Sequence, residues 1–196
     1  AALSGFSNDK IIAVCKLGNV VYWNGTEWTS PESLGADDFI DIETFPETGK
    51  TIAVGNNGMI FQGELNSPDD FTVTWEDRSI DSDIDLFCIA GEENTGYFIG
   101  GENGSVLTTI NNSYEFMPNP YDEEHHITVL WASEGSGVYA GGTGGLMFYD
   151  GNVWNMLDFF EDKAVEAVWG YGPNDVYAVC TAGTFHWDGF YWSRFS

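Results

Sequence analysis

A short apolar run recurs along the chain at a nearly constant spacing. Its copies end at Cys15, Gly55, Gly100, Gly141 and Cys180, so the steps are 40, 45, 41 and 39 residues. A second marker, the glycine that precedes the next apolar run, recurs in the same phase. It stands at Gly18, Gly58, Gly104, Gly145 and Gly183. Because two separate markers repeat together, the sequence predicts five copies of one structural unit.

Each copy predicts four short β-strands. The apolar runs at 127–131, 138–141 and 146–149 supply the first three strands of one copy. The third strand ends in an Asn-Gly or Asp-Gly pair at 24–25, 150–151 and 188–189, and such pairs favour type I′ hairpins, in which both central residues take positive φ. An aromatic residue then recurs in the predicted fourth strand, and this repetition predicts a packing role. These residues are Trp28, Trp75, Phe116, Trp154 and Trp192.

Four strands in about 40 residues are typical of one blade of a β-propeller. A single blade cannot bury both faces of its sheet, so blades pack side by side and close a ring. The sequence therefore predicts an all-β protein: a five-bladed β-propeller with four antiparallel strands per blade, in one domain over 1–196. The expected blades are 1–36, 37–82, 83–125, 126–164 and 165–196. The chain begins abruptly at Ala1-Ala2-Leu3, which predicts that it is excised from a longer protein.

The repeat pattern is Gly-x-apolar-apolar followed by Asn/Asp-Gly-x-x-Trp, as at 24–28, 150–154 and 188–192. It resembles the short-bladed propeller repeats of BNR/sialidase-like and Ycf48-like proteins. The stretch VWGYGPNDVYAV at 168–179 is similar to repeats of bacterial and phage surface proteins. The resemblance implies the propeller fold and a location on an extracellular or virion surface. It does not imply an activity, because propellers host many functions.

The chain is strongly acidic, with 31 acids against six bases and a formal net charge of −25. Such a surface repels phosphate backbones and anionic lipid, which predicts no nucleic-acid partner, and no apolar run is long enough for membrane insertion. Basic surfaces are the favoured partners, although the charge can also serve solubility alone.

Thirteen of the acids fall in the predicted connections between blades. In a propeller these connections share one face with the turns between second and third strands. The thirteen are Glu32, Asp37, Asp38, Glu76, Asp77, Asp81, Asp83, Asp122, Glu123, Glu124, Asp158, Glu161 and Asp162.

Aromatic residues in these connections predict a ligand site. Tyr121, Phe159 and Phe160 lie among acids, where the repeat requires no core residue. Sugar sites combine an aromatic platform with hydrogen-bond acceptors, although an apolar staple beneath the loop is an open alternative. The candidate ligand-binding residues are Tyr121, Phe159, Phe160, Asp122, Glu123, Glu161 and Asp162.

Three acids predict a cation site near the propeller axis. We place Asp41, Asp85 and Glu166 at matching second positions of the inner strands in blades two, three and five. Converging carboxylates bind Ca²⁺ or another cation, stay solvated, or have raised pKa values. No other cofactor is implied.

Sialidase activity is excluded, because that family clamps its substrate with three arginines and this chain has only Arg78 and Arg194. A glycoside hydrolase acting through Asp85 and Glu166 is an alternative. The leading interpretation is a non-enzymatic recognition module that binds a glycan or a protein receptor. An acidic scaffold that docks a basic protein partner is the other binding interpretation.

Overall fold

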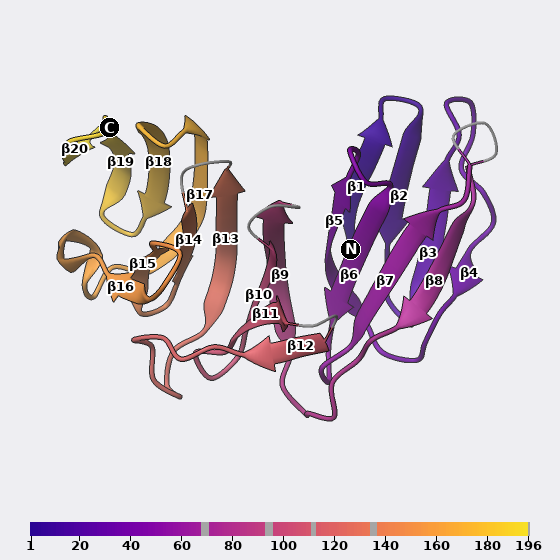
Figure 1. Cartoon of the computed structure of the whole chain (residues 1–196), viewed down its shortest axis with the longest axis horizontal. Helices are drawn as coiled ribbons and strands as arrows, with labels where there is room; N and C mark the ends of the chain where they lie inside the picture. Colours follow the sequence, from indigo (N-terminus) through magenta and orange to yellow (C-terminus); the bar gives the residue numbers. More distant parts are fainter. Residues whose placement is uncertain (68–70, 93–95, 111–112, 134–136, 196) are drawn as a thin grey trace. The chain divides into compact units, whose positions relative to one another are not determined.

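The computed structural model describes residues 1–67, 71–92, 96–110, 113–133 and 137–195. Apart from one short 3-10 helix, η1 (Asp158–Phe160), the regular structure of these residues is β-strand, and the strands form five four-stranded antiparallel sheets (Figure 1). Each sheet is made of four strands that are consecutive in the chain, and each falls within one expected blade range. In the described part of the chain, no helix is long and apolar enough to cross a membrane.

The bounds of the strands are as follows. The first sheet contains β1 (Ala2–Ser7), β2 (Lys10–Val14), β3 (Asn19–Trp23) and β4 (Glu32–Ser33). The second contains β5 (Phe39–Phe45), β6 (Lys50–Gly55), β7 (Ile60–Leu65) and β8 (Val73–Asp77). The third contains β9 (Leu86–Glu92), β10 (Gly96–Gly101), β11 (Val106–Ile110) and β12 (Ser113–Phe116). The fourth contains β13 (Ile127–Ser133), β14 (Gly137–Gly142), β15 (Gly145–Tyr149) and β16 (Trp154–Met156). The fifth contains β17 (Val165–Gly172), β18 (Asp175–Cys180), β19 (Gly183–Trp187) and β20 (Trp192–Arg194).

The chain divides into two compact units, 1–89 and 90–196, with the boundary inside β9. Each unit has its own buried cluster, formed where the apolar faces of neighbouring sheets meet. In the first unit Val14 and Val20 of the first sheet pack with Phe39 and Ile42 of the second. The burial of alternate residues in β2 and β3 matches the two-residue period of a strand.

In the second unit, the cluster lies between the fourth and fifth sheets. Tyr139 and Leu146 of the fourth sheet pack with Val165 and Phe185 of the fifth. Phe160, from the connection between these sheets, is fully buried in the same cluster. The connection is therefore anchored by a core residue, and this anchor positions the residues on either side of it.

The Asn-Gly and Asp-Gly pairs form hairpin connections as predicted, but the predicted type I′ conformation is wrong. Gly151 has a φ of 97°, whereas Asp150 before it has no positive φ. The Asp150 carboxylate instead accepts the N–H groups of Asn152 at 2.9 Å and Val153 at 3.0 Å. These bonds lower the pKa of Asp150. Asn24 and Asp188 make the same pair of bonds, so the side chain replaces a left-handed backbone in shaping the turn.

The repeated fourth-strand aromatics split into two groups. Trp154 is buried, and Trp75 and Trp192 pack against the buried clusters, so the predicted packing role is confirmed for these three. The prediction is wrong for Trp28 and Phe116, which are 47% and 56% exposed. In the first sheet the fourth strand forms later in the chain, at β4, and Trp28 makes only an isolated bridge to Trp23.

Candidate ligand site

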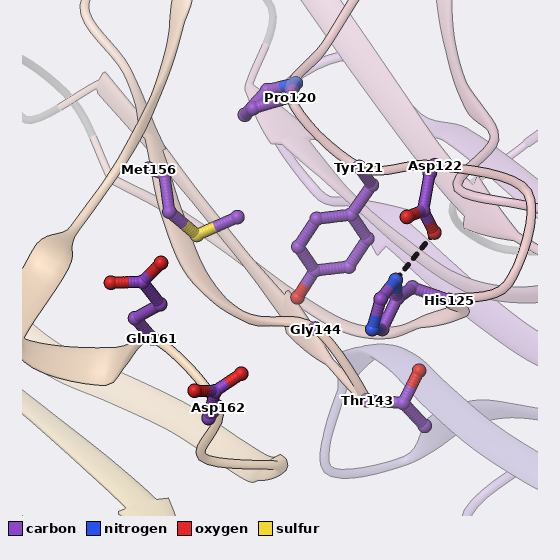
Figure 2. Close-up of a pocket in the computed structure, with 9 residues that line it drawn as sticks. All are labelled: Pro120, Tyr121, Asp122, His125, Thr143, Gly144, Met156, Glu161 and Asp162. Carbon is purple, nitrogen blue, oxygen red and sulfur yellow. Dashed lines mark hydrogen bonds and ion pairs between the residues drawn. The ribbon is translucent and has the colours of Figure 1, made fainter.

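A hollow of about 300 Å³ opens in the second unit, where three connections meet (Figure 2). The first connection, 117–126, joins β12 to β13, and the second is the two-residue turn between β14 and β15. The third, 157–164, joins β16 to β17. In this unit, inter-sheet connections and a turn between second and third strands therefore share a surface, as the propeller pattern predicts. The lining residues are Pro120, Tyr121, Asp122, His125, Thr143, Gly144, Met156, Glu161 and Asp162.

The hollow lies beside a shortened turn. In the third sheet the paired residues Gly100 and Val106 enclose five residues, whereas Gly141 and Leu146 in the fourth sheet enclose four. The longer turn has two consecutive left-handed residues, with φ values of 55° and 64° at 103 and 104. Its Gly104 N–H donates to the carbonyl of His125 at 2.6 Å, which ties the turn to the following connection.

The shorter turn of the fourth sheet is approached from the preceding connection instead. The Tyr121 hydroxyl donates to the carbonyl of Gly145 at 2.7 Å. The second sheet shows the opposite arrangement, because there the carbonyl of the marker glycine Gly58 accepts the N–H of Ile80 from the connection that follows the turn. Burial raises the pKa of Tyr121, so its phenol stays protonated as a donor. The Tyr121 ring is thus held at the edge of the hollow.

One wall of the hollow depends on the absence of a side chain at Gly144. A Cβ there would lie 3.0 Å from ring atoms of both His125 and Tyr121. These two rings contact one another with centroids 5.8 Å apart. His125 Nδ1 also lies 2.5 Å from Asp122 Oδ1, and this hydrogen bond lowers the pKa of Asp122. The Asp122 carboxylate on this wall is therefore already engaged.

Glu161 and Asp162 lie on the side of the hollow opposite His125 (Figure 2). They follow directly after the buried anchor Phe160. The centroids of the Phe160 and Trp192 rings lie 4.8 Å apart. Asp162 has a φ of 61°, a left-handed conformation that aspartate and asparagine adopt more readily than most residues. The anchor and this backbone conformation together hold two acidic side chains at the rim.

The carboxylates of Glu161 and Asp162 make no hydrogen bond and no ion pair with the described residues. The neighbouring cation does not neutralise them. Lys163 Nζ donates to the carbonyl of Phe159 at 2.6 Å and lies 5.5 Å from the centroid of the Phe159 ring. This wall of the hollow therefore carries two unpaired negative charges.

Four of the seven predicted ligand-binding residues line the hollow, namely Tyr121, Asp122, Glu161 and Asp162. Glu123 is exposed on the first connection and does not line it. Phe160 has no exposed surface, so for this residue the staple alternative holds. Phe159 is 42% exposed and rests against Phe160 and Phe185.

Sequence reasoning did not place Pro120, His125, Thr143, Gly144 or Met156 in the ligand site. The signal that could have indicated the turn is the glycine-rich stretch GGTGG at 141–145. The apolar residue Leu146 follows its marker glycine directly, whereas Ser105 separates Gly104 from Val106 in the third copy. His125 follows three acids in the first connection, but nothing in the sequence shows that its ring meets Tyr121.

The predicted axial carboxylates do not occupy matching positions. The first strands of sheets two, four and five begin with Phe39, Ile127 and Val165, each followed by a bulge. Counted from these residues, Glu166 is second but Asp41 is third. Asp85 precedes β9 altogether. The proposed equivalence is therefore wrong. The bulge is common to these three strands, and the mismatch arises because β5 begins at Phe39, one residue before the position that the sequence pattern aligned with Val165.

Asp41 and Asp85 have structural partners within the first unit. The Asp41 carboxylate accepts the N–H groups of Ile42 at 2.9 Å and Ile89 at 3.0 Å. Asp85 accepts the Asn56 side-chain amide at 2.8 Å and the Asn57 N–H at 3.1 Å. Glu166 is exposed in the second unit. Among the described residues, no three His, Cys, Asp or Glu side chains lie close enough to hold a metal ion.

Glu43 is a half-buried acid that sequence reasoning missed. It lies two residues beyond Asp41 on β5, so both side chains project from the same face of the strand. Burial first, and the nearby Asp41 charge second, raise the pKa of Glu43 to about 7. Burial also raises the pKa of Asp41. The sequence pattern Asp-x-Glu in an inner strand was the available signal.

Comparison with known proteins supports the architecture. A crystal structure of the WD40 β-propeller domain of Doa1 superposes on 96% of this chain with a TM-score of 0.70, at 10% sequence identity. This chain covers 64% of the length of that one. No protein-family model matches the sequence, and no curated protein was found as a relative. The chain thus has a β-propeller fold in which the five four-stranded sheets are the blades, and propellers commonly serve as binding or scaffold modules.

Proposed function

We propose that the chain is a non-enzymatic recognition module that binds a basic segment of a protein partner at the hollow of its second unit. The observation that carries this proposal is the pair of unpaired carboxylates, Glu161 and Asp162, at the wall of a formed hollow. None of the described residues that line the hollow is a lysine or arginine. Both side chains are exposed, and their negative charge attracts a cation from outside the chain.

The size of the hollow and the charge of the chain support the same conclusion. A volume of about 300 Å³ suits one side chain rather than a protein surface. The surrounding connections carry further exposed acids, including Glu123 and Asp158, that would attract the flanking basic residues. A net charge of −25 accelerates the approach of a basic partner over a longer range. WD40 propellers, the class of the structural neighbour, typically bind proteins.

A glycan is the second candidate ligand. The Tyr121 ring offers an apolar surface, and the carboxylates around it are acceptors for sugar hydroxyls. This ligand fits the extracellular or virion-surface location, the BNR-like resemblance and the larger parent protein that the sequence predicts. Catalysis on such a glycan is disfavoured for Asp85, because its carboxylate is committed to Asn56 and Asn57.

The two candidates differ in their response to salt. Binding of a fluorescent peptide of alternating lysine and glycine, and binding to an immobilised glycan panel, are measured at low and high salt. We expect peptide binding that weakens as salt screens the carboxylates. Glycan binding that survives high salt, without peptide binding, would replace the protein partner by a sugar. Binding of neither probe would contradict the recognition proposal.

A further inference from the structure

We infer that the hollow receives the guanidinium group of an arginine side chain from the basic partner, an inference that rests on the proposed function. The hollow combines unpaired carboxylates on one wall with an oriented aromatic ring and an engaged carboxylate on the other. Three features of the hollow favour a guanidinium over other cations. These are its unpaired carboxylates, the separation of its acids on two walls, and the aromatic ring of Tyr121.

The exposed carboxylates of the hollow favour a cation that the described chain does not supply. Glu161 and Asp162 are unpaired among the described residues, and Lys163 beside them is bonded to the Phe159 carbonyl at 2.6 Å. On the other side His125 is bonded to Asp122. Lys163 and His125 are therefore already engaged, and the negative charge of the Glu161 wall is left for a ligand.

The acids of the hollow lie too far apart to converge on a metal ion. A metal ion needs several oxygen atoms converging on one position within about 2.6 Å. The described residues contain no such group of three, and Figure 2 shows Asp122 on the side of the hollow opposite Glu161 and Asp162. A guanidinium is planar and carries five N–H donors in a fixed fork, so it can bond to Glu161 and Asp162 together. An ammonium group presents a compact charge to fewer acceptors.

The apolar lining fits a flat group on an aliphatic stem. Tyr121 and Met156 both line the hollow, and the hydrogen bond from the Tyr121 hydroxyl to Gly145 fixes the ring in place. Guanidinium groups stack on aromatic faces, whereas the more strongly hydrated lysine ammonium loses more by leaving water. Because the ring is already oriented, binding would cost little further conformational entropy.

The test compares three labelled peptides of identical length and sequence in which the same positions hold arginine, lysine or citrulline. Citrulline keeps the shape of arginine without its charge. The measurement is fluorescence anisotropy with the whole chain. We expect the arginine peptide to bind about threefold to tenfold tighter than the lysine peptide, as for one well-oriented bidentate ion pair. The citrulline peptide is expected to bind more weakly than either.

Two double variants with the same change of charge locate the binding. In Glu161→Gln/Asp162→Asn the preference for arginine over lysine should disappear, because the hollow has lost its unpaired carboxylates. Asparagine also tolerates the left-handed conformation at 162, so the fold should persist, and urea unfolding checks this. In the control Glu123→Gln/Asp158→Asn, exposed acids of the same connections are neutralised outside the hollow, and the preference should remain.

The outcomes separate this inference from the proposed function. Equal affinities for the arginine and lysine peptides would overturn the guanidinium inference while leaving a basic partner in place. Equal loss of the preference in both double variants would overturn it as well, because general charge would then explain the binding. No binding of either basic peptide would overturn both the inference and the proposed function.

Discussion

The connection after the second blade, 78–85, and the connection after the fourth, 157–164, each contain three acids but use them differently. In the first of these, Asp85 is held by the side chain of Asn56 and the N–H of Asn57. In the second, Glu161 and Asp162 have no partner among the described residues. The first connection thus contains one structural carboxylate beside the unpaired Asp81 and Asp83, whereas none of the three carboxylates of the second connection is bonded to a described residue.

The bonds of Asp85 depend on the neighbouring turn and on its position directly before β9. The turn between β6 and β7 carries two asparagines and has a left-handed pair, Asn57-Gly58. The N–H of Asn57 donates to Asp85, and the N–H of Gly58 donates to the carbonyl of Ile84. The turn between β14 and β15 is one residue shorter and contains Thr143 and Gly144, which have no amide side chain to offer. Whether an acid stabilises the fold or remains free for a ligand is therefore decided by a residue from another part of the chain.

The largest effect is expected at the anchor of the 157–164 connection. Phe160→Ala should lower the free energy of unfolding by about 3 to 5 kcal/mol, because a fully buried ring is replaced by a cavity. Phe159→Ala is the matched control and should cost much less, since Phe159 is 42% exposed. Urea denaturation measures both. Equal losses would show that the connection is not held by its buried anchor.

The next effect concerns Glu43, a half-buried acid of the first unit. Its pKa is raised from 4.5 to about 7, so between these pH values the folded chain keeps a proton that the unfolded chain has released. The free energy of unfolding therefore falls as the pH rises through this window, by about 3 kcal/mol in total. Glu43→Gln cannot ionise and should lose this part of the pH dependence. Urea midpoints are compared below 4.5 and above 7, and parallel profiles for the two proteins would contradict the burial of this acid.

A direct contrast between the two connections comes from neutralising one acid in each. Asp85→Asn should lower the free energy of unfolding by about 2 kcal/mol, because an amide group then faces the donors of Asn56 and Asn57. Glu161→Gln removes the same charge without breaking a bond and should stay within about 0.5 kcal/mol of the parent. Both values come from denaturant unfolding at neutral pH. A loss at Glu161 as large as that at Asp85 would remove the distinction between the connections.

The smallest effect is expected at Tyr121. Tyr121→Phe keeps the ring but removes the bond to the Gly145 carbonyl, which should cost about 1 kcal/mol of stability. The arginine peptide should bind somewhat more weakly, because the ring is less firmly oriented. Thermal unfolding and anisotropy measure the two changes. Full stability in the variant would show that this hydrogen bond does not hold the ring.

The repeat made the sheets predictable, but not the details that depend on one added or missing residue. The strands followed from apolar runs that alternate with glycine, and all five sheets formed within the expected ranges. Asp41 differs from the position assigned to it because β5 begins at Phe39, a start that the apolar pattern of the sequence does not mark. The Asn24-Gly25 turn differed from prediction because the asparagine side chain replaced a left-handed backbone residue.

The site was predictable in part for a similar reason. Tyr121 and Asp162 could be selected because a loop aromatic among acids and a cluster of acids are visible in the sequence. The hollow itself depends on the length of a turn that lies between these two connections, and on the absence of a Cβ at Gly144. Phe160 carried the same signal as Tyr121, yet its ring lies in the core. Only the packing of the fourth and fifth sheets distinguishes the two residues.

The distinction between engaged and available carboxylates can be measured in the unmodified protein. Carboxyl-carbon NMR of chain labelled at aspartate and glutamate is recorded while the arginine peptide is added. The signals of Glu161 and Asp162 should move, whereas those of Asp41 and Asp85 should stay in place, because the latter are already bonded to N–H donors. Movement of Asp85 while Glu161 and Asp162 stay still would show that turn length does not decide which acids are free to bind.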